Sequence, residues 1–256
     1  MVDNSKVGVG IITCNRKEAF EQLWEQVSSN QDIDCVVAVK NLSFDYGSTA
    51  AHCIEVKEDK GVGFCKNVAM KQLLNNGCEH IFLIEDDMKL LDPAVFSKHI
   101  FTAKHFHLGH LNWNTLPEVK DNPTYVIEDG DFALDISYRL CGCFSYFSSE
   151  ALQQCGLIDA KHYINALEHA EHAYRIAAQG LTTPFYSFAG VHDAGKMLTN
   201  VGEGSSTIDH ESMQYKLRLL KAQDAFTKTY GKKMIEIPQQ GVKEVVAFLR
   251  GAMNEA

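Results

Sequence analysis

Hydrophobic residues in the first part of the chain alternate between continuous runs and runs with helical spacing. The segment Val7–Thr13 is apolar throughout, which is typical of a parallel strand buried on both faces. Phe20, Leu23, Trp24 and Val27 then recur at spacings of three and four, as on the apolar face of a helix. The pattern therefore predicts a strand followed by an amphipathic helix.

The same alternation continues along the next 60 residues. Cys35–Val39 and Cys53–Val56 predict two more strands, and Gly63–Asn76 predicts a helix that ends at Gly77. His80–Ile84 predicts a fourth strand. Strands that alternate with helices in this way predict an α/β fold with a mostly parallel central sheet flanked by helices.

The second half of the chain predicts shorter elements in a mixed order. Its strand-like segments are Tyr125–Ile127, Phe132–Ile136 and Cys143–Phe147. Its helical segments are Ser149–Cys155, Leu167–Gln179, a long helix from about Asp209 to Tyr230, and Val242–Met253. The segment 202–206 is rich in glycine and serine and predicts a flexible loop before the long helix.

Three acidic residues, Glu85, Asp86 and Asp87, directly follow the fourth predicted strand. The polar turn Cys14–Arg16 follows the first, and ligands of parallel sheets bind beyond the carboxyl ends of such strands. Carboxylates two positions apart on an extended segment point the same way and offer the oxygen ligands that Mg²⁺ or Mn²⁺ prefers. A polar strand end or a helix N-cap is the structural alternative for the triplet.

Four segments, in this order, resemble the inverting glycosyltransferases of family 2. They are Val7–Arg16, similar to the first strand and nucleotide-contacting turn; Gly61–Asn67, to a Gly-rich segment; Phe82–Asp87, to a strand ending in a DxD-type motif; and Glu168–Gly180, to an acidic acceptor segment. The resemblance covers about 170 residues. It implies a GT-A fold, a nucleotide-sugar donor, and Mn²⁺ or Mg²⁺ as cofactor.

The resemblance also implies roles for single residues. The expected donor-binding residues are Thr13, Asn15, Arg16, Asn41, Lys66, Asn67, Glu85 and Asp86. The expected metal ligands are Asp87, Glu85 and His192, the last of which follows the apolar stretch 185–191. The expected acceptor-binding residues are Gly142, Glu171 and Arg175.

Two positions depart from the family pattern. Asn41 stands where relatives carry an aspartate that contacts the nucleobase, and Glu168-His169 replaces a Glu-Asp pair that includes the general base. Either residue of this pair is a candidate base. We expect Glu168, because it shares a helix face with His172 and Arg175, and adjacent helix residues point about 100° apart. A solvated helix face with ion pairs is the alternative for this segment.

Histidine clusters raise the alternative of a zinc site. His169 and His172 form one pair, and His105, His107 and His110 form a second group. Spacings of this kind are common by chance among 11 histidines, and no cysteine pair of the CxxC type accompanies them. The eight cysteines are expected to be reduced thiols.

Composition narrows the classes of partner. The chain has 256 residues, of which 45% are hydrophobic, and 24 basic against 33 acidic residues give a formal net charge of −9, which argues against nucleic-acid binding. No apolar run predicts a transmembrane segment, and no signal region opens the sequence, so we expect a cytoplasmic protein. The basic stretch Lys216–Lys233 predicts a solvated helix face, with an anionic acceptor, a lipid-linked diphosphate or peripheral membrane contact as alternatives.

The sequence thus predicts a glycosyltransferase domain at residues 1–200, with a nucleotide-sugar-binding half at 1–92 and an acceptor-binding half at 93–200, and a C-terminal helical extension at 201–256. By family analogy we expect a UDP-sugar donor and a glycan or glycoconjugate acceptor. The chain could also be one module of a larger polymerase. Alternative functions are a nucleotidyltransferase of sugar phosphates, a dinucleotide-dependent oxidoreductase, or a non-catalytic sugar-binding module. Gly8 and Gly10 lie within a strand instead of after it, which argues against the oxidoreductase.

Overall fold

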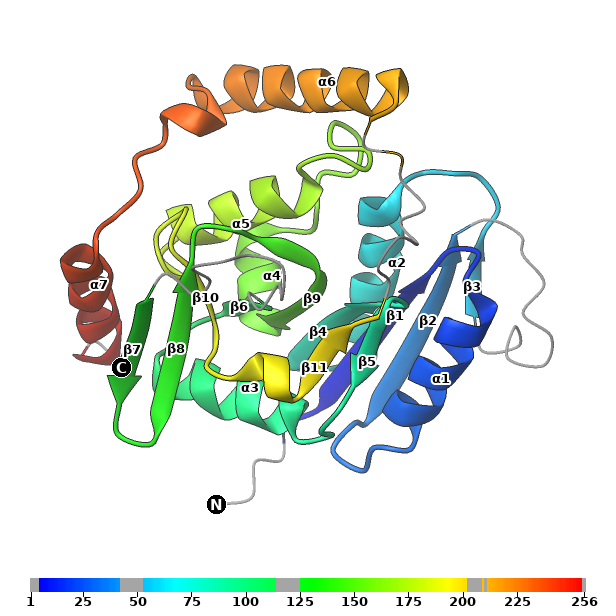
Figure 1. Cartoon of the computed structure of the whole chain (residues 1–256), viewed down its shortest axis with the longest axis horizontal. Helices are drawn as coiled ribbons and strands as arrows, with labels where there is room; N and C mark the ends of the chain where they lie inside the picture. Colours follow the sequence, from blue (N-terminus) through cyan, green and yellow to red (C-terminus); the bar gives the residue numbers. More distant parts are fainter. Residues whose placement is uncertain (1–4, 42–52, 114–124, 202–208, 210, 255–256) are drawn as a thin grey trace.

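The computed structural model describes residues 5–41, 53–113, 125–201, 209 and 211–254, so the predicted loop at 202–206 lies outside the described part. Its centre is a six-stranded sheet in the order β3-β2-β1-β4-β9-β6 (Figure 1). These strands are β1 (Val7–Thr13), β2 (Cys35–Asn41), β3 (Cys53–Val56), β4 (His80–Glu85), β6 (His110–Trp113) and β9 (Cys141–Ser148). The first four are parallel, whereas β9 pairs antiparallel with both β4 and β6.

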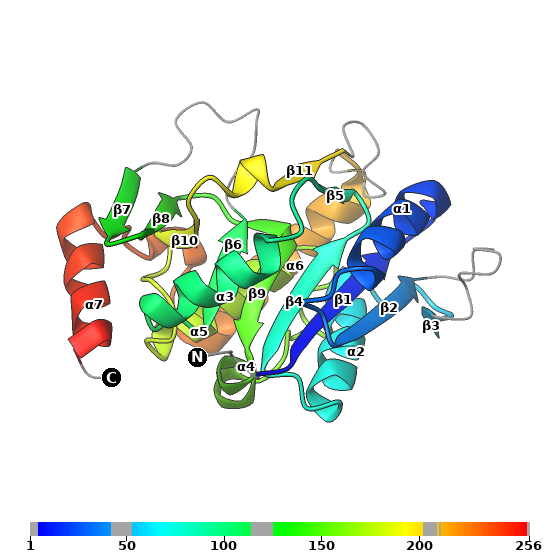
Figure 2. The same ribbon diagram turned by 90° about the horizontal axis from the view of Figure 1, so that it is seen from below.

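Helices cover both faces of this sheet. On one face lie α1 (Lys17–Ser28) and α3 (Val95–His105), which Figure 2 shows in front of the strands. On the other face lie α2 (Val62–Asn75), α4 (Ser149–Cys155) and α5 (Glu168–Ala178). β4 packs Phe82 and Ile84 against the first layer and Ile81 and Leu83 against the second, so its four middle positions all have to be apolar.

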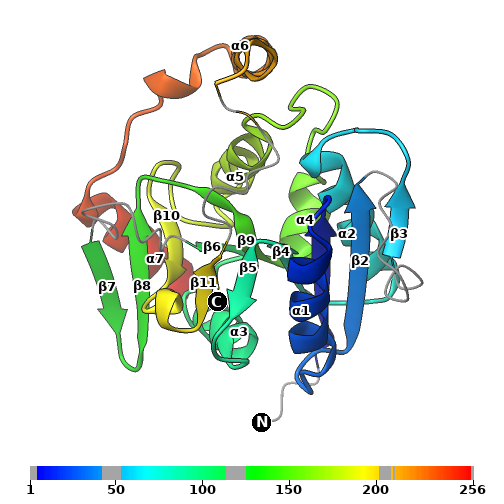
Figure 3. The ribbon, with the colours of Figure 1, turned by 45° about the vertical axis from the view of Figure 1, so that its right-hand side comes forward.

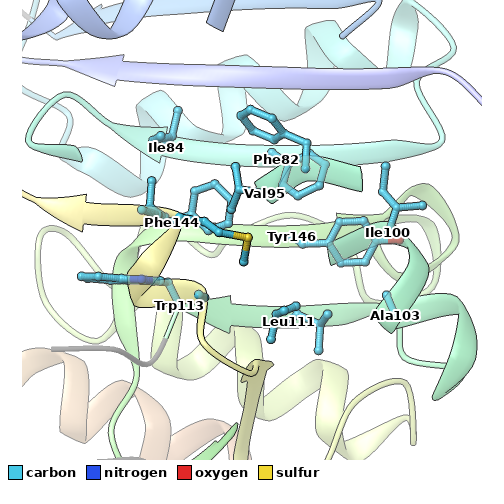
Figure 4. Close-up of a cluster of buried hydrophobic side chains, with 14 of the residues drawn as sticks. Phe82, Ile84, Val95, Ile100, Ala103, Leu111, Trp113, Phe144 and Tyr146 are labelled. Carbon is cyan, nitrogen blue, oxygen red and sulfur yellow. The ribbon is translucent and has the colours of Figure 1, made fainter. Parts of the chain in front are cut away.

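A group of buried aromatic residues lies in the hydrophobic core between α3 and the sheet (Figure 4). Phe82 meets Phe96 edge to face with ring centres 5.0 Å apart, and Phe144 and Tyr146 of β9 lie 5.8 and 5.2 Å from the Phe82 ring. All four rings are at most 1% exposed, and each such side chain contributes roughly 1.5–3 kcal/mol through burial. This contact holds β9 beside β4 and so brings the second half of the chain next to the parallel strands.

Gly8 and Gly10 allow α2 to lie close to β1. A Cβ atom on Gly10 would lie 2.8 Å from the Cβ of Ala69, and one on Gly8 would lie 2.7 Å from the side chains of Leu73 and Cys78. The two glycines of the first strand are therefore explained by packing.

Two small sheets flank the central one. A three-stranded antiparallel sheet has the order β10-β8-β7, and a two-stranded ribbon pairs β5 with β11. Their bounds are β5 (Met88–Leu90), β7 (Tyr125–Asp129), β8 (Phe132–Ser137), β10 (Phe188–Val191) and β11 (Leu198–Asn200), with the 3-10 turn η2 (Ala194–Lys196) between the last two.

The C-terminal helices pack on two different parts of the molecule. Helix α6 (Met213–Tyr230) crosses above α5, where Phe226 and Ala222 are fully buried (Figures 1 and 3). The chain then passes through the 3-10 turn η3 (Met234–Glu236) to α7 (Val242–Asn254), which lies beside the β7-β8 hairpin and buries Val245 and Leu249. Among the described residues, no helix is long and apolar enough to cross a membrane.

The fold class predicted from the sequence is confirmed. The four parallel strands lie where the apolar runs predict them, and Gly77 ends α2 with a positive φ of 76°. The sequence pattern did not predict α3, β5, β6, β10 or β11. The last four are strands of only three or four residues, too short to show a period.

Candidate functional site

A cavity of about 690 Å³ opens at the carboxyl ends of β1, β2 and β4. From the first half of the chain, the turn after β1 and Glu85–Asp87 line it, and from the second half Cys141–Cys143 and residues 165–169. Residues of α6 and of the segment before it also contribute to the lining, namely Asp209, Ser212, Gln214, Tyr215 and Arg218. Both halves of the chain therefore contribute to one cavity.

Asp86 ties the turn after β1 to the end of β4. Its Oδ2 accepts hydrogen bonds from the Thr13 hydroxyl at 2.7 Å and the Cys14 backbone N–H at 3.1 Å, and its Oδ1 lies 2.8 Å from Arg16 Nη2. The side chain is 1% exposed. Burial raises the pKa of Asp86 to about 6, although Arg16 and the Thr13 hydrogen bond lower it. Asp86 is thus a buried connector that places Arg16 at the cavity wall.

Asp87 and Glu85 offer carboxylate oxygens to the cavity. Asp87 Oδ2 lies 3.5 Å from Arg16 Nη1, while its Oδ1 is buried and accepts no hydrogen bond from a described residue. Glu85 lies 2.7 Å from Lys66 Nζ, which also donates to the Gly142 carbonyl at 2.7 Å. Burial, followed by the charge of Glu85, raises the pKa of Asp87. Each carboxylate is therefore partly neutralised by a basic side chain.

These carboxylates fit a divalent cation that takes part of its coordination from a ligand. Among the described residues, no three His, Cys, Asp or Glu side chains converge as a preformed metal site. Mg²⁺ and similar cations are commonly held by one or two carboxylates, with phosphate oxygens and water completing the shell. The buried Oδ1 of Asp87, next to the Glu85 carboxylate, provides oxygen atoms of this kind.

The amide of Asn41 and the carboxylate of Asp59 also line the cavity. Asn41 ends β2, and its Nδ2 donates to Asp59 Oδ1 at 3.4 Å, while the Asn41 Oδ1 is buried without a hydrogen bond from a described residue. Asp59 also accepts from the Gly61 backbone N–H at 3.1 Å, which holds the carboxylate in place. Together they present an amide and a carboxylate to the cavity.

Glu168 and His169, at the start of α5, form a hydrogen-bonded pair in the cavity lining. His169 Nδ1 lies 3.1 Å from Glu168 Oε1; the imidazole is 33% exposed and the carboxylate 6%. Burial alone would raise the pKa of Glu168, but the hydrogen bond and charge of His169, together with Lys66, lower it to about 2. The carboxylate is therefore held ionised, and it orients the imidazole that faces the cavity.

Gly142 leaves room for this imidazole. A Cβ atom at position 142 would lie 2.9 Å from His169 Nδ1. The neighbouring thiols, Cys141 and Cys143, lie with their sulfur atoms 2.9 Å apart on the same wall. All eight cysteines are free thiols, as the sequence predicts.

The structure brings most of the predicted site residues together. Those that line the cavity are Thr13, Arg16, Asn41, Glu85, Asp86, Asp87, Gly142, Glu168 and His169. Lys66 does not line the cavity, but it forms an ion pair with Glu85, which does.

Five further predicted residues do not line the cavity. Asn15 is exposed in the turn, and Asn67 exchanges two hydrogen bonds with the backbone of residue 158. Glu171 and Arg175 point away toward the loop after α4, and His192 is 39% exposed and pairs with the Asp135 carboxylate at 2.6 Å. Of the helix face that Glu168 shares with His172 and Arg175, only Glu168 therefore reaches the cavity.

The histidine clusters do not form a zinc site in the described part of the chain. His110 Nδ1 bonds the Tyr146 carbonyl at 2.7 Å, and His172 Nε2 bonds the Gly156 carbonyl at 2.9 Å. Both are core histidines satisfied by backbone groups.

Sequence reasoning missed three residues that shape the cavity, Asp59, Tyr215 and Arg218. Asp59 carried a usable signal, because it follows β3, the strand adjacent to β2 in a parallel sheet. Tyr215 and Arg218 lie on α6 and reach the cavity through tertiary packing, so no local pattern indicated them.

Comparison with solved structures gives the class of fold. The mannosyltransferase PcManGT from Pyrobaculum calidifontis, solved in complex with GDP-Man and Mn²⁺, matches with a TM-score of 0.56 at 13% identity, over 98% of this chain and 70% of that one. TarS from S. aureus matches with a TM-score of 0.52 at 12% identity, over 98% of this chain and 53% of that one. No known family model and no curated protein matches the sequence.

The chain therefore has a GT-A fold, with a mostly parallel central sheet and helices on both faces. It spans about half the length of the TarS chain and 70% of the PcManGT chain.

Proposed function

We propose that the protein is an inverting glycosyltransferase that moves a sugar from a nucleotide-sugar donor to a hydroxyl of a glycan or glycoconjugate. The observation that carries the proposal is one cavity lined both by Arg16 and Glu85–Asp87 and by the Glu168–His169 pair. Groups suited to a diphosphate thus share a cavity with a group suited to taking a proton. This arrangement favours glycosyl transfer over a sugar-binding module, which needs no such pair.

The donor would lie along the carboxyl ends of the parallel strands. Its base would contact Asn41 and Asp59, and we expect uracil, whose N3–H can donate to the Asp59 carboxylate. Its diphosphate would lie near Arg16, which the buried Asp86 holds in place. A divalent cation held by Asp87 and Glu85 would neutralise charge on the leaving diphosphate.

His169 is the better candidate for the general base, in contrast to the sequence-based preference for Glu168. A carboxylate with a pKa of about 2 is a weak base, and catalytic bases work best with a pKa near the operating pH. When Nδ1–H of a neutral His169 donates to Glu168, Nε2 is left to accept a proton. Glu168 then acts as a positioning residue.

The proposed reaction is a single displacement. His169 Nε2 accepts the proton of the acceptor hydroxyl, and that oxygen attacks the anomeric carbon from the side opposite the diphosphate. The bond from the anomeric carbon to the diphosphate oxygen breaks, and the nucleoside diphosphate leaves with the electron pair. The imidazolium that forms is stabilised by the adjacent Glu168 carboxylate.

The proposal is tested by incubating the full chain with UDP-, GDP- and dTDP-sugars and Mn²⁺, and by measuring nucleoside diphosphate release with and without mixed glycan acceptors. We expect release from a UDP-sugar that increases with acceptor. Binding of a nucleotide sugar without release would support the sugar-binding module instead. Pyrophosphate formation from a sugar phosphate and a nucleoside triphosphate would support the nucleotidyltransferase.

A further inference from the structure

Helix α6 presents an apolar stripe to solvent. Met213, Leu217 and Leu220 are 72%, 50% and 57% exposed, although each is a large hydrophobic side chain. Their spacings of four and three place them on one side of the helix. We call these three residues the α6 stripe.

The stripe is not needed to hold α6 on the protein. The opposite side of the helix buries Ala222 and Phe226 against Tyr163 and Ala166, and Tyr230 donates a hydrogen bond to Glu171. Figures 1 and 3 show α6 as the outermost element on its side of the molecule. The packing of α6 therefore leaves the stripe outward.

Lysines flank the stripe on both sides. Lys216, Lys221 and Lys228 are exposed, and by helical geometry Lys216 projects on one side of the stripe while Lys221 and Lys228 project on the other. From residue 216 to 233 the chain has six basic residues and one acidic residue, Asp224, against a net charge of −9 for the whole protein. Lys216 makes one exposed ion pair with Glu211 at 3.1 Å, which is weak at such a site.

We propose that the α6 stripe and its flanking lysines bind the surface of an anionic lipid bilayer. A helix that lies in the plane of a membrane inserts apolar side chains just below the headgroups and keeps lysine ammonium groups at headgroup level. The concentration of positive charge on one face of an acidic protein complements an anionic leaflet.

A second copy of the chain fits this surface less well. Two α6 stripes in contact would bring their lysines together, and like charges at an interface oppose association. Three side chains are also few for a stable protein interface, which usually buries about 800 Å² per partner.

Binding through this face would bring the cavity within one helix diameter, about 10 Å, of the membrane surface. The helix that carries the stripe also lines the cavity, through Tyr215 and Arg218 on its other side.

The test is co-sedimentation of the full chain with vesicles of phosphatidylcholine containing about one third phosphatidylglycerol, at low salt. We expect binding to these vesicles and little binding to pure phosphatidylcholine. The double variant Leu217→Glu/Leu220→Glu should lower the partition coefficient at least tenfold. Lys221→Glu should lower it roughly fivefold or more, because each lysine near an anionic leaflet contributes about that factor.

Phe101→Glu is the matched control, because Phe101 is a 51% exposed apolar residue on α3, at the opposite side of the molecule from α6. It should bind vesicles as the parent does. All variants should keep the parental circular dichroism and melting temperature. The proposal is overturned if the parent ignores anionic vesicles, if the double variant binds equally well, or if light scattering shows a dimer that the double variant abolishes.

Discussion

The pair Glu168–His169 shows how one neighbour sets the chemistry of a residue. Glu168 is 4% exposed and within reach of two basic groups, His169 and Lys66, which together outweigh the effect of burial on its pKa. The carboxylate keeps its charge, and the less buried imidazole faces the cavity. Roles that look interchangeable in the sequence are therefore separated by burial and charge.

Replacing His169 should remove the proposed general base. His169→Ala should reduce kcat by two or more orders of magnitude with donor affinity unchanged, a loss typical of general-base catalysis. Glu168→Gln should reduce kcat less, because it removes orientation and not the accepting nitrogen. His105→Ala on α3, outside the cavity lining, is the control and should keep parental rates. If Glu168→Gln abolishes turnover while His169→Ala retains it, the assignment is reversed.

Replacing Asp87 should weaken metal-dependent nucleotide binding. Asp87→Asn keeps the size of the side chain but removes the negative charge of the carboxylate, whose Oδ1 is buried. Calorimetry with UDP should show at least a tenfold loss of affinity in Mn²⁺ and little change in EDTA. Asp32→Asn, at an exposed position outside the cavity, is the matched control. Equal affinity of parent and Asp87→Asn in Mn²⁺ would remove Asp87 from the metal site.

At the scale of elements, α5 is held by a network centred on Arg175. This guanidinium bonds both carboxylate oxygens of Glu171 at 2.7 and 3.1 Å, the Leu157 carbonyl at 2.7 Å and the Cys155 carbonyl. Tyr230 of α6 donates to the same Glu171 at 2.5 Å. One ion pair thus connects α5, the loop after α4, and α6.

Arg175→Ala should therefore reduce stability more than acceptor affinity. Removing one partner of a buried ion pair typically costs about 3–5 kcal/mol, and Glu171 is 3% exposed. Chemical denaturation should show this loss, while KM for the acceptor stays within a few-fold of the parent at a temperature where both are folded. Arg250→Ala, an exposed arginine on α7, should leave stability unchanged. A large rise in acceptor KM without loss of stability would restore the acceptor-binding role.

At the scale of the whole molecule, three buried histidines make stability depend on pH. Burial lowers the pKa of His99 and His110 to about 4 and of His172 to about 3, from a usual 6.5. Each is neutral in the native state, so its contribution is complete above pH 6.5 and is lost as pH falls toward the native pKa. Asp86, with a native pKa raised to about 6, acts in the opposite direction between pH 6 and 3.8.

The balance predicts loss of stability on mild acidification. Near pH 5, unfolding takes up at most 3 − 1 = 2 protons from these four groups, which corresponds to up to about 2.7 kcal/mol per pH unit. The melting temperature should fall between pH 6.5 and 5. In His99→Leu it should fall less steeply, because unfolding then takes up about one proton fewer. A melting temperature that is constant or rises over this range would contradict the prediction.

The sequence by itself determined the parallel core and the position of the acidic triplet. Val7–Thr13 and His80–Ile84 are readable because strands buried on both faces must be apolar throughout. Once these strands are parallel, Arg16 and Glu85–Asp87 have to meet at one edge, because the carboxyl ends of parallel strands lie together.

Only the tertiary structure decided which way α5 faces and what closes the cavity. A helix pattern fixes which residues share a face but not the rotation of that face, which packing against α4 and α6 sets. For this reason Glu168 and His169 reach the cavity while Glu171 and Arg175 point into the protein. Arg218 lies far from the parallel strands in the sequence and enters the same cavity through the packing of α6, which no local pattern records.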